Sequence, residues 1–119
     1  MLLPTIVVAI AVLATPADAR TEVTIGDQFH AATLVAPNRL SLWASDSLLD
    51  LRWSGWGGAT ATATGKVSTH AYGHYRYSPA RVTASRLGPC GRHMIYTRLR
   101  YTRDGRWHSA HLFHCRFSA

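Results

Sequence analysis

Residues 49–65 read LDLRWSGWGGATATATG, and this stretch decides the fold. Its first five residues alternate apolar and charged side chains and end on Trp53, which is the period-two pattern of a half-buried β-strand. Residues 54–58 interrupt the alternation with three glycines. Because glycine tolerates positive φ angles, we expect a turn or bulge there, with Trp56 in its middle. An alternation of Ala and Thr follows and predicts a second strand.

The Ala/Thr alternation also predicts which side of this strand faces the interior. Lys66 continues the threonine side, and a lysine belongs in water, so we place the threonines outside and the alanines inside. A row of alanines leaves room for an indole ring, which buries about 150–250 Å². We therefore expect Trp53 to pack on the alanines of residues 59–63. Trp56, flanked by glycines, is expected to be the more exposed ring and a candidate ligand contact.

The N-terminal residues predict export. Residues 1–13 form a short apolar run, and residues 14–19 end in Ala-Asp-Ala, whose small residues fit a signal-peptidase site with cleavage before Arg20. The run is shorter than the roughly 20 residues that a membrane-spanning helix needs. No basic side chain precedes it, so only the amino terminus supplies positive charge there. We expect residues 1–19 to be a signal peptide and residues 20–119 to be one secreted, extracellular domain.

The mature domain is strongly basic. The chain has 13 Lys and Arg against 6 Asp and Glu, and removal of residues 1–19 takes away one acid, which leaves a net charge of +8 with neutral histidines. All but one of the basic residues are arginine, which binds phosphate and carboxylate groups in bidentate geometry. The charge predicts attraction to anionic cell-wall polymer, polysaccharide or a membrane surface, without specific binding of nucleic acid. A genome rich in G and C would raise the arginine content without any ligand.

The two cysteines, Cys90 and Cys115, predict a disulfide bond, since an even pair in an exported domain is most often oxidised. Closing a loop of this length would add about 3 kcal/mol to the free energy of unfolding, mainly by restricting the unfolded chain. A metal site built from Cys and His is the alternative, and export favours the disulfide.

The C-terminal part contains the clearest hairpin pattern. Residues 93–102 and 107–118 flank an Asp-Gly pair, which is a strong signal for a type I′ turn. A two-residue loop would pair Leu99 with Ala110, and alternate residues of the segment 95–101 would then share one face. This register predicts a long antiparallel hairpin at the end of the chain.

Shorter strand patterns fill the rest of the mature domain. Pro79 has no N–H group to donate, so we expect no central strand in residues 70–77, and residues 87–92 predict a loop. No segment of the mature chain shows helical periodicity. The whole pattern predicts an all-β fold, a single small β-sandwich or barrel of about eight short antiparallel strands behind the apolar signal segment. The further strands are expected at residues 21–25, 28–35, 40–44 and 81–86.

The residues that could carry chemistry form no recognisable catalytic or metal-binding motif. On a strand, the spacing of His108, His111 and His114 turns the middle ring to the opposite face and separates the outer two by about 20 Å. The sequence contains no nucleophile elbow, phosphate loop or dinucleotide fingerprint. We expect no metal, no other cofactor and a non-enzymatic domain. The alternative is a secreted hydrolase whose catalytic residues come from distant strands.

Residues 70–77, HAYGHYRY, mix aromatic and basic side chains. Such a mixture suits stacking on sugars or bases with an arginine nearby for an anion. The alternative is an edge strand whose tyrosines cover the core. The sequence thus predicts binding of an anionic cell-envelope polymer or glycan. The candidate ligand-binding residues are Trp56, Tyr72, His74, Tyr75, Arg76, Tyr77, Arg81 and Arg86.

Three segments resemble a group of small secreted proteins of high-GC Gram-positive bacteria. They are PNRLSL at residues 37–42, the opening stretch at residues 49–65, and GHYRYSPARVT at residues 73–83. The hallmark of that group is W-x-x-W-G-x-x-x-A-x-G-x-G followed by a strand similar to Tyr-Pro-Val. Many members carry a C-x-P-x-C segment next, whereas residues 68–71 stand there in this chain and contain no cysteine. The resemblance implies secretion and one β-rich domain, and it transfers no catalytic residue.

Overall fold

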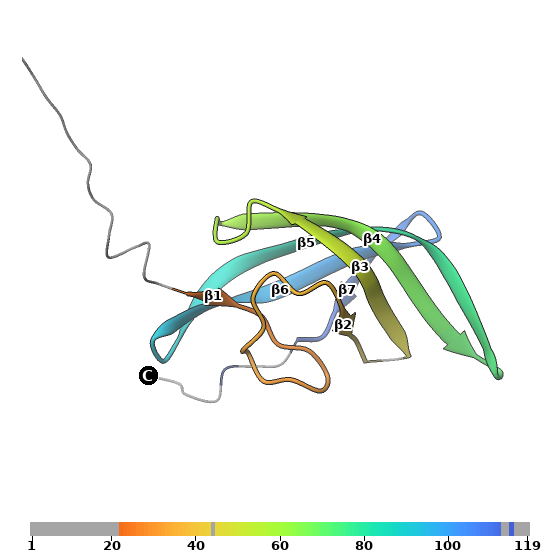
Figure 1. The fold of residues 1–119 in the computed structure, drawn as a ribbon, viewed down its shortest axis with the longest axis horizontal. Helices are drawn as coiled ribbons and strands as arrows, with labels where there is room; N and C mark the ends of the chain where they lie inside the picture. Colours follow the sequence, from red (N-terminus) through yellow and green to blue (C-terminus); the bar gives the residue numbers. More distant parts are fainter. Residues whose placement is uncertain (1–21, 44, 113–114, 116–119) are drawn as a thin grey trace, which may run out of the picture.

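The structure, a computed structural model, describes residues 22–43, 45–112 and 115. These residues form an all-β fold of seven strands, and none of them lies in a helix (Figure 1). A helix long and apolar enough to cross a membrane is therefore absent from this part of the chain. The predicted signal peptide, residues 1–19, lies outside the described residues. The strands are β1 Val23–Thr24, β2 Leu40–Ser41, β3 Asp46–Ser54, β4 Thr60–Ala71, β5 His74–Cys90, β6 His93–Arg103 and β7 Arg106–Ala110.

One curled sheet contains all seven strands, in the order β1-β6-β5-β4-β3-β2, with β7 also paired to β6. Neighbours from β2 to β7 are antiparallel, whereas β1 runs parallel to the beginning of β6. The sheet bends into an open half-barrel, and the segment between β1 and β2 crosses in front of it (Figure 1). The all-β prediction is confirmed. The architecture is one half-barrel sheet instead of the predicted sandwich or barrel of about eight short strands.

β5 is longer than the sequence pattern indicated, because it continues through Pro79 as far as Cys90. The pairing of β5 with β6 ends at Val82, and the next N–H group on that side, from Arg81, donates to the Thr102 hydroxyl at 2.9 Å. Pro79 lies two residues before Arg81, so its backbone nitrogen faces the same side of β5, beyond the last pair with β6. No described residue pairs with β5 on that side, so the N–H group that proline lacks removes no hydrogen bond between strands. The predicted loop at residues 87–92 is reduced to a tight turn after β5.

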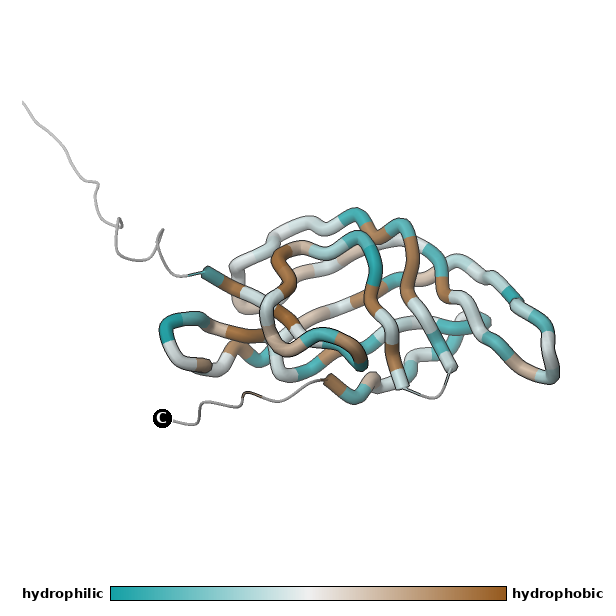
Figure 2. The backbone as a smooth tube through the Cα atoms, turned by 60° about the horizontal axis from the view of Figure 1, so that its bottom comes forward, coloured by the Kyte–Doolittle hydropathy of each residue, from teal (hydrophilic) through white to brown (hydrophobic). Residues whose placement is uncertain are grey.

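The inside and outside of the Ala/Thr strand are as predicted. Ala61 and Ala63 are buried, while the threonines between and beside them are exposed. Trp53 lies directly opposite Ala63 in the β3–β4 register, so the two side chains share a face, and the half-buried indole packs on the core. Figure 2 shows hydrophobic positions recurring along the central strands. The largest fully buried apolar side chains are Ile25, Leu40, Leu48, Val67, Val82, Tyr96 and Leu99.

Trp53 and Trp56 connect the N-terminal segment to the sheet by hydrogen bonds. The indole N–H of Trp53 donates to the Pro37 carbonyl at 2.6 Å, and the indole N–H of Trp56 donates to the Val23 carbonyl at 3.0 Å. Their rings meet edge to face with centroids 4.8 Å apart. Trp56 is half-buried against the core, like Trp53, so it is not an exposed ring in the glycine turn.

Tyr96 fixes the glycine turn that carries Trp56. Its hydroxyl accepts the N–H of Gly57 at 3.0 Å and donates to the Gly58 carbonyl at 2.7 Å. Its ring meets Trp56 edge to face at 5.0 Å. Burial raises the pKa of Tyr96, so the phenol stays protonated and able to donate at neutral pH. The turn is therefore held by β6 and does not project freely into solvent.

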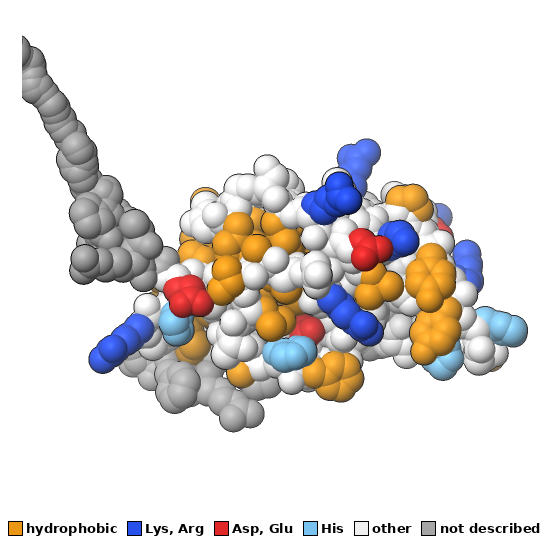
Figure 3. Space-filling model, in the orientation of Figure 1, with side chains coloured by type: hydrophobic (Ala, Val, Ile, Leu, Met, Phe, Trp, Pro, Cys, Tyr) orange, Lys and Arg blue, Asp and Glu red, His pale blue; other side chains and the backbone are white. Residues whose placement is uncertain are grey.

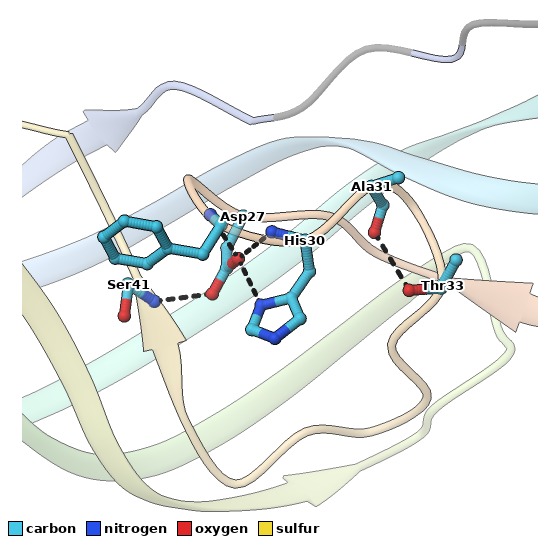
Figure 4. Close-up of polar contacts among 6 residues, drawn as sticks. Asp27, His30, Ala31, Thr33 and Ser41 are labelled. Atoms are coloured by element: carbon cyan, nitrogen blue, oxygen red, sulfur yellow. Dashed lines mark hydrogen bonds and ion pairs between the residues drawn. The ribbon is translucent and has the colours of Figure 1, made fainter.

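The segment between β1 and β2 is folded around Asp27 (Figure 4). One carboxylate oxygen of this buried residue accepts the N–H groups of Phe29 and His30 and lies 2.8 Å from the His30 ring nitrogen Nδ1. The other oxygen accepts the Ser41 N–H at 2.8 Å. Burial alone would raise the pKa of Asp27, but the bonds from Ser41, His30 and Phe29 outweigh it and lower the pKa. The strand predicted at residues 28–35 is wrong, because the Asp27 carboxylate accepts backbone N–H groups that would otherwise bond to a neighbouring strand.

The predicted disulfide bond and hairpin near the C-terminus are present, but the second strand of the hairpin, β7, ends at Ala110, so it is shorter than the predicted strand at residues 107–118. Cys90 and Cys115 form a disulfide bond, and β6 and β7 form a hairpin with the predicted pairing of Leu99 with Ala110. The strict alternation predicted along β6 is wrong at Thr97, which is exposed, because the opposite residue Arg86 has a positive φ of 58°. The Thr97 hydroxyl donates to the Arg86 carbonyl at 2.7 Å, and this contact bridges the kink.

Candidate anion-binding face

The side of the sheet opposite the core carries rows of hydroxyl and guanidinium groups. Directly opposed residues of antiparallel strands point to the same side, so the register defines these rows. One row crosses five strands, from Ser54 through Thr62, Thr83 and Arg100 to Ser109. We name this surface the outer face, formed by Arg52, Ser54, Thr60, Thr62, Thr64, Arg81, Thr83, Ser85, Arg98, Arg100, Thr102, Trp107 and Ser109.

Four arginines share the outer face. Arg52 and Arg81 are exposed and lie on either side of one intervening strand, which separates their backbones by about 10 Å. Arg98 and Arg100 are half-buried and lie about 7 Å apart along β6. A polymer with repeating negative charges could contact several of these guanidinium groups at once.

Trp107 borders the outer face at β7. Its ring is 43% exposed, and the guanidinium carbon of Arg100 lies 5.3 Å from the ring centroid. This cation–π contact holds the arginine beside the ring of a tryptophan that is partly exposed to solvent. The pair therefore offers both a charge and a stacking surface.

Two adjoining hollows deepen the outer face around Arg81. One of about 590 Å³ lies between β4, β5 and the β6–β7 turn, and one of about 440 Å³ lies between β3, β4 and β5. Arg81, Thr64 and Trp107 line both hollows. A ligand chain lying across the outer face would therefore pass directly over Arg81.

None of the acidic residues that the structure describes forms an ion pair with these arginines, although Asp104 lines the larger hollow together with Arg81. Asp27 and Asp46 are buried. Asp50 lies 3.3 Å from the Lys66 ammonium, and Asp104 lies 3.9 Å from the Arg76 guanidinium. Within the described residues, the arginines of the outer face have no acidic partner within ion-pair distance. Their charge is therefore available to a ligand.

Asp46 organises the polar contacts of the inner side instead. Its carboxylate accepts the Thr69 hydroxyl at 2.8 Å, the Tyr101 hydroxyl at 2.5 Å and an Arg103 guanidinium N–H at 2.6 Å. Burial, together with the hydrogen bond to Asp46 and its charge, raises the pKa of Tyr101. The phenol is thus a permanent donor, and the network cross-links three strands.

The structure brings some of the sequence-predicted ligand residues together. Tyr72 is fully exposed at the tip of the β4–β5 hairpin, and Tyr75 and Tyr77 are 63% and 62% exposed. Tyr75 stacks on His70 with ring centroids 4.6 Å apart. Figure 3 shows hydrophobic side chains and histidines gathered at that end of the molecule. Because residues of one strand two apart share a side, Tyr75 and Tyr77 lie on the same side of β5 as Arg81.

The other predicted ligand residues lie elsewhere. Arg76 and His74 alternate with the tyrosines and therefore lie on the inner side of the sheet. Trp56 is half-buried in the glycine turn that Tyr96 holds. Arg86 sits at the kink of β5, about 17 Å along the strand from Arg81. These residues do not form one contact surface.

Four residues of the outer face were not predicted from the sequence: Arg52, Arg98, Arg100 and Trp107. The sequence did contain a signal for the arginines, because they alternate with the core residues of β6 and with the apolar residues of β3, and this alternation places them on the side opposite the core. What the sequence did not supply was the register that places β3, β4, β5 and β6 side by side. The long-range pairing of the strands therefore decided which basic residues gather.

Among the described residues, no group of three or more His, Cys, Asp and Glu side chains could hold a metal ion. His108 contacts the Tyr101 ring with centroids 5.7 Å apart, and His30 is bound to Asp27. His114 lies outside the described residues. Comparison of the chain with known protein families, with curated proteins and with solved structures found no match.

Proposed function

We propose that the mature domain is a secreted, non-enzymatic module that binds an anionic polymer of the cell envelope through the outer face. The single observation that carries this proposal is the gathering of four arginines without an acidic partner in the described part of the chain. The serine and threonine rows supply hydroxyl donors between the charges. A broad face with repeated charges suits an extended ligand better than a small molecule.

Two further observations support secretion. The disulfide between Cys90 and Cys115 is suited to an oxidising compartment. The N-terminal apolar run and its Ala-Asp-Ala site have the pattern of a signal peptide. A basic exported domain meets anionic polymer at the envelope first, and its net charge increases the rate of that encounter.

The proposal predicts a strong dependence of affinity on salt. Each anionic group neutralised by an arginine releases condensed counterions, so the logarithm of the binding constant should fall linearly with the logarithm of the salt concentration. The measurement is a titration of residues 20–119 with polygalacturonate at several salt concentrations, with dextran as the uncharged control. Affinity that is independent of salt, or equal for dextran, would contradict the proposal.

A further inference from the structure

We infer that the unpaired edge of β5 binds an acidic peptide segment of a partner protein as an added β-strand. This inference goes beyond the proposed function, because backbone hydrogen bonds would hold this ligand, whereas charge holds the polymer. It rests on a free strand edge and on a groove that follows this edge.

Near the hairpin tip, β5 has a strand partner on only one of its edges. Residues 74–85 pair with β4, whereas the pairing with β6 begins only at Val82. Residues 75–81 therefore form a free edge about 20 Å long, with which no described strand pairs. Figure 1 shows the β4–β5 hairpin projecting beyond the rest of the sheet at this end. The length of the edge matches a peptide of about six residues.

The backbone direction along β5 shows which groups point to the free edge. In an antiparallel ladder, the N–H and carbonyl groups of one residue point to the same neighbouring strand, and those of the next residue point to the other. Arg81 points to the free edge, because its N–H donates to the Thr102 hydroxyl there. Tyr75, Tyr77 and Pro79 alternate in step with Arg81, so their backbone groups point the same way.

His70 gives an independent check of this direction. Its N–H donates to the Ser45 carbonyl at 3.2 Å, away from β5. In the β4–β5 register His70 lies opposite Tyr75, and two opposite residues either bond to each other or both point away. Tyr75 therefore points away from β4. The free edge thus offers the N–H and carbonyl groups of Tyr75 and Tyr77 and the carbonyl of Pro79.

A groove follows this edge between β5 and the β6–β7 turn. A cavity of about 310 Å³ is bordered by residues 76–78 and 103–104, and the hollow of about 590 Å³ is bordered by residues 78–81 and 102–105. The two share Ser78 and Asp104, so they adjoin. A strand added to β5 would lie about 4.8 Å from it, in this groove, with side chains alternating between the inner and outer sides.

The charges beside the groove favour an acidic segment. Arg81, on the outer side, has no acidic partner within ion-pair distance among the described residues. Arg76, on the inner side, is 76% exposed and lies 3.9 Å from Asp104, so its guanidinium has room for a second carboxylate. A second copy of this chain fits less well, because pairing two β5 edges would bring two strongly basic domains together.

The test measures binding of the peptide EVTVTE, acetylated and amidated at its ends, to the mature protein by titration calorimetry. Its glutamates are five residues apart, as are Arg76 and Arg81, so they lie on opposite sides of a strand. The peptide should bind, and methylation of its four central backbone nitrogens should weaken binding at least about tenfold, since this removes the donors and keeps the charge. The lysine analogue KVTVTK should bind at least about tenfold more weakly.

Tyr77→Pro and Tyr77→Ala form a matched pair of variants. Both remove the ring, but only proline removes the N–H at the free edge and places its own ring in the path of a strand. Neither removes a bond to β4, because Tyr77 points away from it. Tyr77→Pro should bind the peptide at least about fivefold more weakly than Tyr77→Ala. The two variants should bind polygalacturonate within about twofold of each other and give the same circular dichroism spectrum.

The outcomes separate this inference from the proposed function. Equal binding of the peptide and its methylated form would overturn the added strand, even if Tyr77→Pro failed to fold, and so would equal binding by two folded variants. Equal binding of the lysine analogue, or no binding of EVTVTE at low salt, would overturn the acidic partner. A dimer that Tyr77→Pro abolishes would assign the edge to a second copy instead. Binding of polygalacturonate tests only the proposed function.

Discussion

At the scale of single residues, the indole N–H groups explain why tryptophan occupies positions 53 and 56. Each N–H reaches a backbone carbonyl of the N-terminal segment, Trp53 at Pro37 and Trp56 at Val23. A phenylalanine would keep most of the ring packing but would leave each carbonyl without its donor. The pattern W-x-x-W-G-G therefore works as a clamp that holds the segment crossing the half-barrel.

We predict that Trp53→Phe and Trp56→Phe each lower the free energy of unfolding by about 1–3 kcal/mol, the cost of leaving a buried polar group unpaired. Trp53→Ala should cost about 3–5 kcal/mol, since it also opens a cavity. Urea denaturation measures these values. Trp107→Phe is the control and should change stability by less than about 0.5 kcal/mol, because that ring is exposed. Wild-type stability in both Phe variants would disprove the clamp.

Because of Asp27, the free energy of unfolding depends on pH in the acid range. Because the folded state lowers its pKa, Asp27 stabilises the fold above its unfolded-state pKa of about 3.9, and that stabilisation is lost as pH falls toward the lower, folded-state pKa. Asp27→Asn should therefore flatten the fall in unfolding free energy between about pH 5 and pH 3. Asp50→Asn, at an exposed site, should follow the wild-type curve. Identical slopes for Asp27→Asn and wild type would refute the assignment.

At the scale of elements, a bulge in β3 and a glycine in β4 fit each other. The β3–β4 register shifts between Leu49 and Arg52, where Asp50 has a positive φ of 53°. A Cβ atom on Gly65 would lie 2.5 Å from the Leu49 carbonyl oxygen and 3.0 Å from that of Asp50. The close approach of the bulged backbone therefore requires glycine at this position.

We predict that Gly65→Ala destabilises the domain by about 1–3 kcal/mol, because the backbone of β3 must move to admit the methyl group. Gly88→Ala is the matched control. It lies in β5, and its added methyl group would meet only the Thr97 side chain, at 3.4 Å. Thermal unfolding of the two variants should separate them by several degrees. Equal melting temperatures would contradict the bulge.

The elements that could be predicted from sequence were those fixed by local chemistry. The Ala/Thr alternation identified the faces of β4, and the Asp-Gly pair set the register of β6 with β7. The segment of residues 28–35 could not be predicted, since a strand pattern does not reveal that the Asp27 carboxylate takes its donors. The length of β5 depended on where β6 ends, which is a tertiary property.

At the scale of the whole molecule, the charges are sorted by the sheet. The acids Asp27 and Asp46 are buried and bonded on the inner side, where they hold the segment and the strands together. The arginines of the outer face, apart from the Trp107 contact, lack such structural partners among the described residues. We therefore predict that position on the sheet, more than net charge, determines which basic residues bind.

The matched comparison of two triple variants tests this claim. Arg52, Arg81 and Arg100 lie on the outer face. The control set consists of the exposed residues Arg39, Arg92 and Arg106, which lie off the outer face, and it removes the same charge.

The decisive measurement is the slope of log affinity for polygalacturonate against log salt concentration, determined for wild type and both triple Gln variants. We predict that the outer-face triple variant loses most of the affinity and has a shallower slope, by up to about one unit for each lost contact. The control triple should keep a slope close to that of wild type. Equal changes in both variants would show that net charge alone, and not the outer face, determines binding.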